Sequence, residues 1–293
     1  GMDPYNVNPY WGIYKSNNNS KKDQFRMNAK AVWNISPKLK LQGTVGAEFN
    51  RFGFNDFQAP TTPGFEAGRL QNSEFNNKMY NAEILALYNN TWGDFDFNGT
   101  LGANMFKVDN LTTITTGQDM KIKDAVAISS FDEISVEQNP YTKQMNSVYG
   151  AVNLGWKHLI YFDATVRADQ SSTLPLNNNV YVYPSFSGSF IFSELIKNRS
   201  LLPYGKIRMS WAQVGSDTNP YQLGLTYTKS RFSYPGYTIG YLNNNTVPNE
   251  NLKPTRTNSF EAGVETKFFN SRLGLDITYY SQTSRDQIMA MAT

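Results

Sequence analysis

The chain has 293 residues, no cysteine and a single histidine, and these counts exclude several classes of protein. Without cysteine there is no disulfide scaffold, thiolate zinc site or cysteine nucleophile, and one histidine leaves no second imidazole to act as a relay. Charged residues make up 17% of the chain, against about 25% in typical globular domains, whereas aromatic residues reach 14%. The net charge of +3 is too small to indicate nucleic-acid binding. No apolar run is long enough for a transmembrane helix, so the composition favours an all-β chain with long polar loops.

The two ends of the chain are typical of a segment cut from a longer protein. Gly1 in front of Met2 is interpreted as the scar of a cleaved tag, and the first residues lack the basic and apolar regions of a signal peptide. Residues 287–293 offer neither a helix cap nor a terminal strand. We therefore expect a trimmed piece, in which a missing targeting signal carries no information.

From residue 25 onward, apolar and polar residues alternate with the period of a β-strand. In the first such segment Phe25, Met27 and Ala29 alternate with Arg26 and Asn28. The predicted strands cover residues 25–35, 39–49, 80–88, 95–105, 148–156, 160–167, 182–192, 204–214, 257–268 and 273–281. One or two helical turns are predicted within residues 193–198.

The lengths of the strands and connections are those of a membrane barrel. Ten residues at roughly 3.3 Å each, tilted by about 40°, cover about 25 Å, which is the height of the apolar band of an outer-membrane barrel. Short and long connections also alternate, as periplasmic turns and extracellular loops do in such barrels, whereas a soluble sandwich faces water at both ends. The short ones lie near 36–38, 91–94, 157–158, 193–203 and 269–272, and the long ones near 50–78, 107–146, 169–181 and 215–256.

The two faces of the predicted strands differ in composition. One face is apolar with small residues, and the other is polar. The polar face carries Lys30, Asn34, Lys40, Gln42, Glu48, Asn98, Asn153, Asp163, Arg167, Glu261, Glu265 and Lys267. Aromatic residues at strand ends are interpreted as the girdles of a barrel in a bilayer, although β-propensity alone also places aromatics there. The predicted girdle residues are Trp33, Phe49, Tyr80, Tyr88, Phe95, Trp156, Phe268 and Tyr279.

Several motifs are specific enough to indicate a family. They are NPYW at 8–11, RADQSSTLP at 167–175, KIRMSWAQVGSD at 206–217 and PNENLKPTRTNSFEAG at 248–263, with further matching residues at 268–280. Together these segments resemble the barrel of SusC-like (RagA-like) TonB-dependent outer-membrane transporters of the Bacteroidetes. The resemblance runs from about residue 8 to the end and is weakest in the predicted loops at 50–78 and 107–146.

The resemblance implies a fold and a function for the parent protein. Family members form a 22-stranded barrel that is plugged by an N-terminal domain and energised by the TonB complex. A SusD-like lipoprotein works with the barrel in the uptake of oligosaccharides or peptides. In this chain residues 1–24 are expected to be an N-terminal loop segment and residues 25–293 a partial barrel, without the plug and closing strands.

No residue pattern predicts catalysis, a metal site or a cofactor. Glu261 and Glu265 share a strand face but lie about 13 Å apart along it, farther than the roughly 5–9 Å that separates the carboxyls of a glycosidase. Whether Glu261 lies near Asp276 depends on a register that the sequence does not give. His158 falls in a two-residue turn, where a solvated or capping role is the simplest interpretation. Lumen-facing charges explain the carboxylates more simply than an active site does.

Aromatic residues interleaved with Asn and Thr in the long loops are candidates for ligand binding. Aromatic rings stack on sugar rings, and Asn supplies both donors and acceptors for hydroxyl groups. The candidates are Trp11, Tyr221, Phe232, Tyr234 and Tyr237. For any one of them, packing within the loops or against a lid protein is the favoured alternative.

The sequence therefore predicts an antiparallel up-and-down segment of a transmembrane β-barrel, part of an outer-membrane nutrient importer and not an enzyme. The main alternative is a soluble or cell-surface all-β module that binds glycans through its aromatic loops. A sandwich of that kind buries its apolar strand face, whereas a barrel turns it outward to lipid, so the two hypotheses differ in which face is covered.

Overall fold

The computed structural model describes residues 7–16, 18–122, 125–196, 200–224, 227–230, 235–242 and 248–289. Long strands dominate these residues. The elements are α1 (Pro9–Lys15), β1 (Asn18–Asn34), β2 (Leu39–Gln58), β3 (Arg69–Trp92), β4 (Phe95–Met120), η1 (Ile128–Ser130), β5 (Phe131–Trp156), β6 (Ile160–Ser171), β7 (Val180–Phe190), η2 (Phe192–Leu195), β8 (Tyr204–Ser216), β9 (Tyr227–Lys229), β10 (Gly240–Leu242), β11 (Thr255–Phe268) and β12 (Leu273–Arg285). None of the described helices has the length and apolar character needed to cross a membrane.

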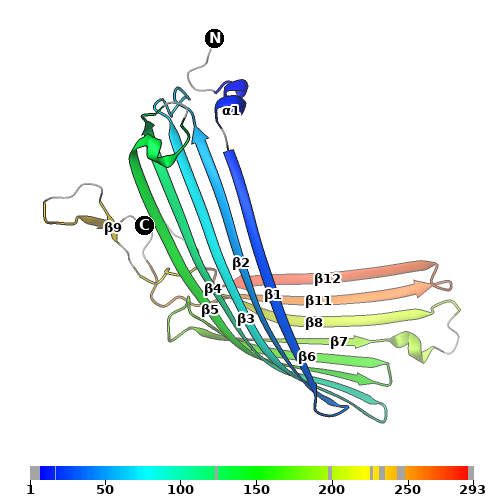
Figure 1. Cartoon of the computed structure of the whole chain (residues 1–293). Coiled ribbons are helices and arrows are strands. Elements are labelled where there is room, and N and C mark those ends of the chain that lie inside the picture. Colours follow the sequence, from blue (N-terminus) through cyan, green and yellow to red (C-terminus); the bar gives the residue numbers. More distant parts are fainter. Residues whose placement is uncertain are drawn as a thin grey trace. The chain divides into compact units, whose positions relative to one another are not determined.

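Ten strands form one sheet in which sequence neighbours pair with each other (Figure 1). The order is β1-β2-β3-β4-β5-β6-β7-β8-β11-β12, and β9 and β10 form a separate two-stranded hairpin between β8 and β11. Register pairs such as Trp156 with Ile160 and Phe268 with Leu273 close the hairpins antiparallel. The predicted all-β, up-and-down antiparallel architecture is confirmed.

The chain divides into two compact units, and β1 to β5 each contribute residues to both. The first unit comprises residues 1–29, 46–81 and 107–142, and the second comprises residues 30–45, 82–106 and 143–293. In the first unit, the buried residues Phe57, Ala59, Leu70 and Phe131 form a small core near the connections 59–68 and 121–130. Each unit is described separately below.

The first five strands are longer than the sequence predicted. The regions 50–78 and 107–146 were expected to be loops. In the first region β2 continues to Gln58 and β3 begins at Arg69. In the second region β4 continues to Met120 and β5 begins at Phe131. These extensions carry polar residues on both faces, so the alternation that identifies a half-buried strand is absent. Backbone pairing needs no such alternation, and β-branched runs such as 112–116 favour it.

The N-terminal segment 1–24 is not a continuous loop, which corrects the sequence prediction. Pro9–Lys15 form a short helix, and β1 begins at Asn18. The Asn8 side chain caps this helix by accepting a hydrogen bond from the Tyr10 backbone NH at 2.9 Å, and Pro9 suits the first helical position. Gly1, interpreted as a tag scar, lies outside the described residues.

The short connections are tight turns, as predicted. Ser36 Oγ accepts hydrogen bonds from the backbone NH groups of Lys38 and Leu39. Lys157 and His158 both adopt positive φ, the conformation of a two-residue hairpin turn, and the His158 side chain is exposed. The predicted helical turn after β7 is present as the 3-10 helix η2.

The apolar strand face of the second unit is exposed in the described residues. Leu101, Val148 and Val166 lie on this face, and at least half of the surface of each residue is accessible. Met209 and Ile277 on later strands are likewise exposed. A sandwich would cover this face with a second sheet, so the fold agrees with the barrel prediction rather than with its alternative.

Candidate functional site

The polar face of the sheet in the second unit is lined by side chains that hydrogen-bond to one another across strands. Asn98 Nδ2 donates to Asn153 Oδ1 at 3.0 Å, and Asn153 in turn donates to Asp163. Ser187 Oγ donates to the other carboxylate oxygen of Asp163 at 2.9 Å. This row crosses β4 to β7, and the register pairs Asn153 with Asp163 and Asp163 with Ser187. The predicted placement of Asn98, Asn153 and Asp163 on one face is confirmed.

A second group on the polar face surrounds Asp169. The Tyr183 hydroxyl donates to Asp169, and Arg167 Nε donates to the same carboxylate at 2.8 Å. The Arg167 guanidinium also lies 5.3 Å from the ring centroid of Tyr149, whose hydroxyl donates to Glu83. Because Asp169 is buried, these donors are what make its charge tolerable. These contacts hold Arg167, Asp169, Tyr183 and Tyr149 in one hydrogen-bonded group on the polar face.

The register settles how the carboxylates of the last strands lie. Glu265 is directly opposite Asp276, and Glu261 is opposite Tyr280. Arg208 donates to Asp276 Oδ1 at 3.0 Å and lies 3.8 Å from Glu261 Oε1. Glu261 and Asp276 therefore share one guanidinium, which offsets the charge of one carboxylate and leaves the group with a net negative charge. Among the described residues there is no cluster of His, Cys, Asp or Glu that could hold a metal ion.

A polar cluster that joins the middle of β5 to the ends of β6 and β8 was not singled out from the sequence as a site. Lys143 Nζ donates to Asp217 Oδ1 at 2.7 Å, and Ser171 Oγ donates to Asp217 Oδ2 at 2.5 Å. Thr173 Oγ1 lies 3.3 Å from the same oxygen. Ser171 and Thr173 are buried, so Asp217 ties together the connections that follow β6 and β8. The sequence motifs that contain Ser171, Thr173 and Asp217 were recognised. The contact between these residues, which lie far apart in the chain, could not be predicted from them.

Three of the five predicted loop aromatics lie among the described residues. The indole NH of Trp11 donates to the buried Thr62 at 3.0 Å, and its ring packs on the core of the first unit. Trp11 is thus held as a packing residue, the alternative that the sequence favoured. Tyr221 and Tyr237 are exposed, with 67% and 76% of each residue accessible. Phe232 and Tyr234 lie outside the described residues.

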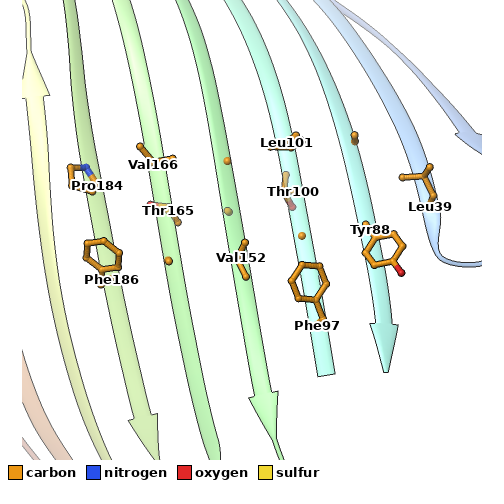
Figure 2. Close-up of a pocket in the computed structure, with 15 residues that line it drawn as sticks. Leu39, Tyr88, Phe97, Thr100, Leu101, Val152, Thr165, Val166, Pro184 and Phe186 are labelled. Atoms are coloured by element: carbon orange, nitrogen blue, oxygen red, sulfur yellow. The ribbon is translucent and has the colours of Figure 1, made fainter. Parts of the chain in front are cut away.

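The apolar face of the second unit carries a shallow hollow of about 630 Å³ (Figure 2). Small residues such as Gly99, Gly150 and Ala164 are among those that line it. Figure 2 shows larger lining side chains such as Phe97 and Phe186. Its lining is almost wholly apolar, so the hollow offers little polar surface that could orient a soluble ligand.

Aromatic rings on the apolar face cluster near the short turns. The Phe95 and Trp156 centroids are 6.3 Å apart, and Phe97 contacts both Tyr88 and Trp92 at 5.9 and 5.6 Å. Phe268 packs against Phe269 at the end of β11, and Trp33 is exposed beside the turn after β1.

Three of the predicted girdle residues do not lie at strand ends. Phe49 and Tyr80 lie inside β2 and β3, because these strands extend farther than the sequence predicted. They still contact each other, with centroids 6.0 Å apart in the first unit. Tyr279 lies in the middle of β12, which continues to Arg285.

Comparisons with known proteins agree with this geometry. A family model described as "TonB dependent receptor-like, beta-barrel" matches residues 2–293. TonB-dependent receptor P3 of Formosa agariphila is 24% identical over 95% of the chain and 29% of the relative, and P26 of the same organism is 21% identical over 96% and 30%. The chain therefore spans about 30% of the length of these curated relatives.

Solved structures share the fold. The structure of the RagAB peptide transporter aligns with a TM-score of 0.85 at 19% identity, over 96% of this chain and 32% of that one. The siderophore receptor PiuA from Acinetobacter baumannii aligns with a TM-score of 0.56 at 13% identity, over 89% and 40%.

Proposed function

The chain belongs to the TonB dependent receptor-like β-barrel family, and on this basis we propose that it forms one section of the wall of an outer-membrane nutrient importer. The family places it in the outer membrane of Gram-negative bacteria, which confirms the location and the TonB-dependent family indicated by the sequence resemblance. Its members are receptors, in agreement with the expectation that the chain is not an enzyme.

The observation that carries the proposal is the contrast between the two faces of one sheet. In the second unit one face exposes apolar side chains, and the opposite face carries hydrogen-bonded polar rows such as Asn98–Asn153–Asp163. A barrel wall requires this contrast, with lipid outside and a water-filled lumen inside. The exposed apolar face also argues against the soluble glycan-binding module.

We propose that the parent protein imports an oligosaccharide or another large nutrient such as a peptide, together with a SusD-like lipoprotein. The RagAB peptide transporter supports the peptide option, and the amides, hydroxyls and carboxylates of the polar face suit either ligand. The long connections and the lipoprotein would capture the ligand. TonB would act through parts of the protein other than this chain, and no bond of the nutrient is broken.

Site residues are assigned within the same proposal. The rim aromatics Trp33, Tyr88, Phe95, Trp156 and Phe268 would lie at the membrane interface near the short turns. Phe49 and Tyr80, which contact each other in the first unit, would also belong to an aromatic girdle, and Tyr279 would face lipid. Exposed Tyr221 and Tyr237 are the loop residues available to a ligand or to the lipoprotein.

The proposal is tested by uptake in cells that produce the full-length protein. Fluorescently labelled oligosaccharides and peptides are supplied to cells with the gene, without it, and with the gene but without TonB. We expect uptake of one of the two classes that requires both the gene and TonB. Equal uptake in all three strains would contradict the proposal.

The lipoprotein partner is tested separately by affinity purification of the tagged full-length protein from membranes. A SusD-like lipoprotein is expected to co-purify in roughly equal amount. If no such lipoprotein co-purifies while uptake persists, the proposed lipoprotein partner would be refuted and the proposed import function would stand.

A further inference from the structure

The first part of β5 extends beyond the end of the neighbouring strand β6. β5 has 26 residues and β6 has 12, and their pairing begins with Met145 opposite Ser171. On the other side β5 still contacts β4, where the Thr142 hydroxyl donates to Asp109 at 2.8 Å. Within the described part of the chain, β4 is therefore the only strand beside residues 131–142.

This stretch is as open to solvent as the outermost strands of the sheet. Every residue from Asp132 to Thr142 is exposed, as is every residue of β1 and of β12. From Lys143 to Trp156, where β6 pairs with β5, most residues are half-buried or buried. Residues 132–142 are called the free edge of β5 below.

The main-chain groups that point out of the free edge follow from the contacts of Gln144. Its carbonyl accepts from the Ser172 NH, and its NH donates to Ser172 Oγ, both at 2.9 Å, so both groups face the β6 side. Because this direction alternates along a strand, the even-numbered residues of 134–142 face the same side. Pro140 belongs to this series, and its missing NH costs no bond to β4. The free edge thus offers unpaired NH and C=O groups to an added strand.

The free edge is also acidic. Residues 131–142 contain Asp132, Glu133 and Glu137 but no cation. Asp132 is paired with Lys121 at 2.5 Å, whereas no ion pair is found for Glu133 or Glu137 in the described residues. Glu133 and Glu137 are four positions apart, so they lie on the same face of the strand.

The charges and exposed side chains indicate which kind of strand could be added. A second copy of this edge would bring the same carboxylates together, so pairing between copies is disfavoured. A strand with basic side chains would instead place cations beside Glu133 and Glu137. On the opposite face Ile134 and Val136 are 51% and 63% exposed and offer apolar contacts. An extended peptide with alternating basic and apolar residues fits both faces.

We propose that the free edge of β5 binds an extended basic peptide, which adds to the sheet as a further strand. The main-chain groups of the edge supply affinity for any extended peptide, and Glu133 and Glu137 select the basic ones. The inference rests on the proposed function, because it takes the peptide option for the nutrient and needs the long connections outside the cell. It assigns to the free edge the first capture of that nutrient.

The test is a titration of purified full-length protein in detergent with a synthetic peptide as long as residues 134–142, in which lysine and valine alternate. Two matched peptides carry N-methyl groups on the lysine amides or on the valine amides. Only one of these two sets can face β5 in an added strand. We expect at least about tenfold weaker binding for one methylated peptide and at most about threefold for the other. Equal binding of the two methylated peptides would overturn strand addition.

Variants of the protein locate the site. Val136→Pro removes an NH that faces the free edge, in the same way as the natural Pro140, and is expected to weaken binding at least about tenfold. Val136→Thr keeps that NH and is expected to bind as the wild type does. Resistance of both variants to SDS shows that the barrel is assembled. Unchanged binding by Val136→Pro would contradict the assigned edge.

A second pair of variants tests the charge preference. Glu133→Gln with Glu137→Gln is expected to weaken binding about threefold to tenfold at low ionic strength. Asp94→Asn with Glu250→Gln removes two exposed carboxylates outside the free edge and is expected to leave binding unchanged. Equal effects of the two double substitutions would refute the role of Glu133 and Glu137.

The binding measurement needs neither TonB nor uptake, so the two proposals can fail separately. TonB-dependent uptake of oligosaccharides without any peptide binding would refute only the free-edge site. Peptide binding with the expected variant effects, but without TonB-dependent uptake, would refute only the import function. Loss of the SusD-like lipoprotein from the Val136→Pro variant, together with no peptide binding by the wild type, would assign the edge to that partner and overturn the peptide site.

Discussion

At the residue scale, the polar face depends on a glycine that allows an aromatic ring to lie flat on the sheet. A Cβ atom added at Gly102 would fall 2.4 Å from Tyr149 Cζ and 2.8 Å from Leu85 Cδ2. Gly102→Ala would therefore displace Tyr149, whose hydroxyl bonds Glu83. We expect a loss of about 1–3 kcal/mol in the unfolding free energy of the full-length protein, measured in urea.

The matched control for that substitution is Gly43→Ala, because nothing lies within 4 Å of a Cβ atom at Gly43. Alanine lowers the entropy of the unfolded chain, so this variant is expected to be more stable by about 0.5–1 kcal/mol. Equal effects of the two substitutions would show that Tyr149 does not need the space above Gly102.

A second residue-scale prediction concerns Asp217. Asp217→Asn removes the negative charge that faces Lys143 and leaves a half-buried ammonium without its ion pair. A hydrogen bond to a charged group is worth about 1.5–3 kcal/mol, so we expect a loss of that size in the urea unfolding experiment. Asp94→Asn breaks the exposed pair with Lys157 and should change stability by roughly 0–1 kcal/mol. Equal losses of unfolding free energy in the two variants would mean that the pair of Asp217 with Lys143 stabilises the protein no more than an exposed ion pair does.

Contacts between individual residues were the feature of the site that the sequence predicted least well. Alternation placed Asn153 and Asp163 on one face, because that inference needs only the period of a strand. The position of Arg208 between Glu261 and Asp276 required the register of three strands, which single-strand patterns do not contain. The contact between Trp11 and Thr62 joins helix α1 to a connection 51 residues away in the chain, which no local pattern predicts.

At the scale of the strand, the two faces should tolerate charge very differently. Leu101 and Thr100 are neighbours in β4, and Leu101 is 69% exposed on the apolar face. Leu101→Lys would place an ammonium in lipid and is expected to cost about 2–4 kcal/mol, whereas Thr100→Lys points into the lumen and should cost little. The measurement is the fraction of full-length protein that is assembled in the outer membrane and resists SDS. Equal assembly of the two variants would contradict the assignment of the faces.

The existence of the strands was predictable where one face is apolar, and their ends were not. Residues 39–49 alternate cleanly, but β2 continues through Arg51 to Gln58, where polar and aromatic residues occur on both faces. Alternation of apolar and polar residues indicates a strand with one face against lipid or a protein core and the other face against water. A strand that projects beyond that boundary is held by backbone hydrogen bonds, to which any side-chain pattern can contribute.

At the scale of the whole molecule, the sheet has two unpaired edges, β1 and β12. Every residue of both strands is exposed in the described structure. In a bilayer an open edge would leave backbone NH and C=O groups without partners, each at several kcal/mol, so transmembrane sheets close. Since the chain spans about 30% of its curated relatives, strands to satisfy these edges are expected in the rest of the protein.

Hydrogen exchange distinguishes a closed sheet from an open one. In the full-length protein, the β12 amides that point away from β11 are expected to exchange as slowly as those bonded to β11, because a further strand accepts their hydrogen bonds. In the 293-residue chain alone, the same amides should exchange at least about a hundredfold faster, unless the chain pairs with another copy through its edges. Dilution tests that exception, since pairing between copies depends on concentration. Fast exchange in the full-length protein would mean that the sheet ends at β12 and that this chain is not a section of a closed barrel wall.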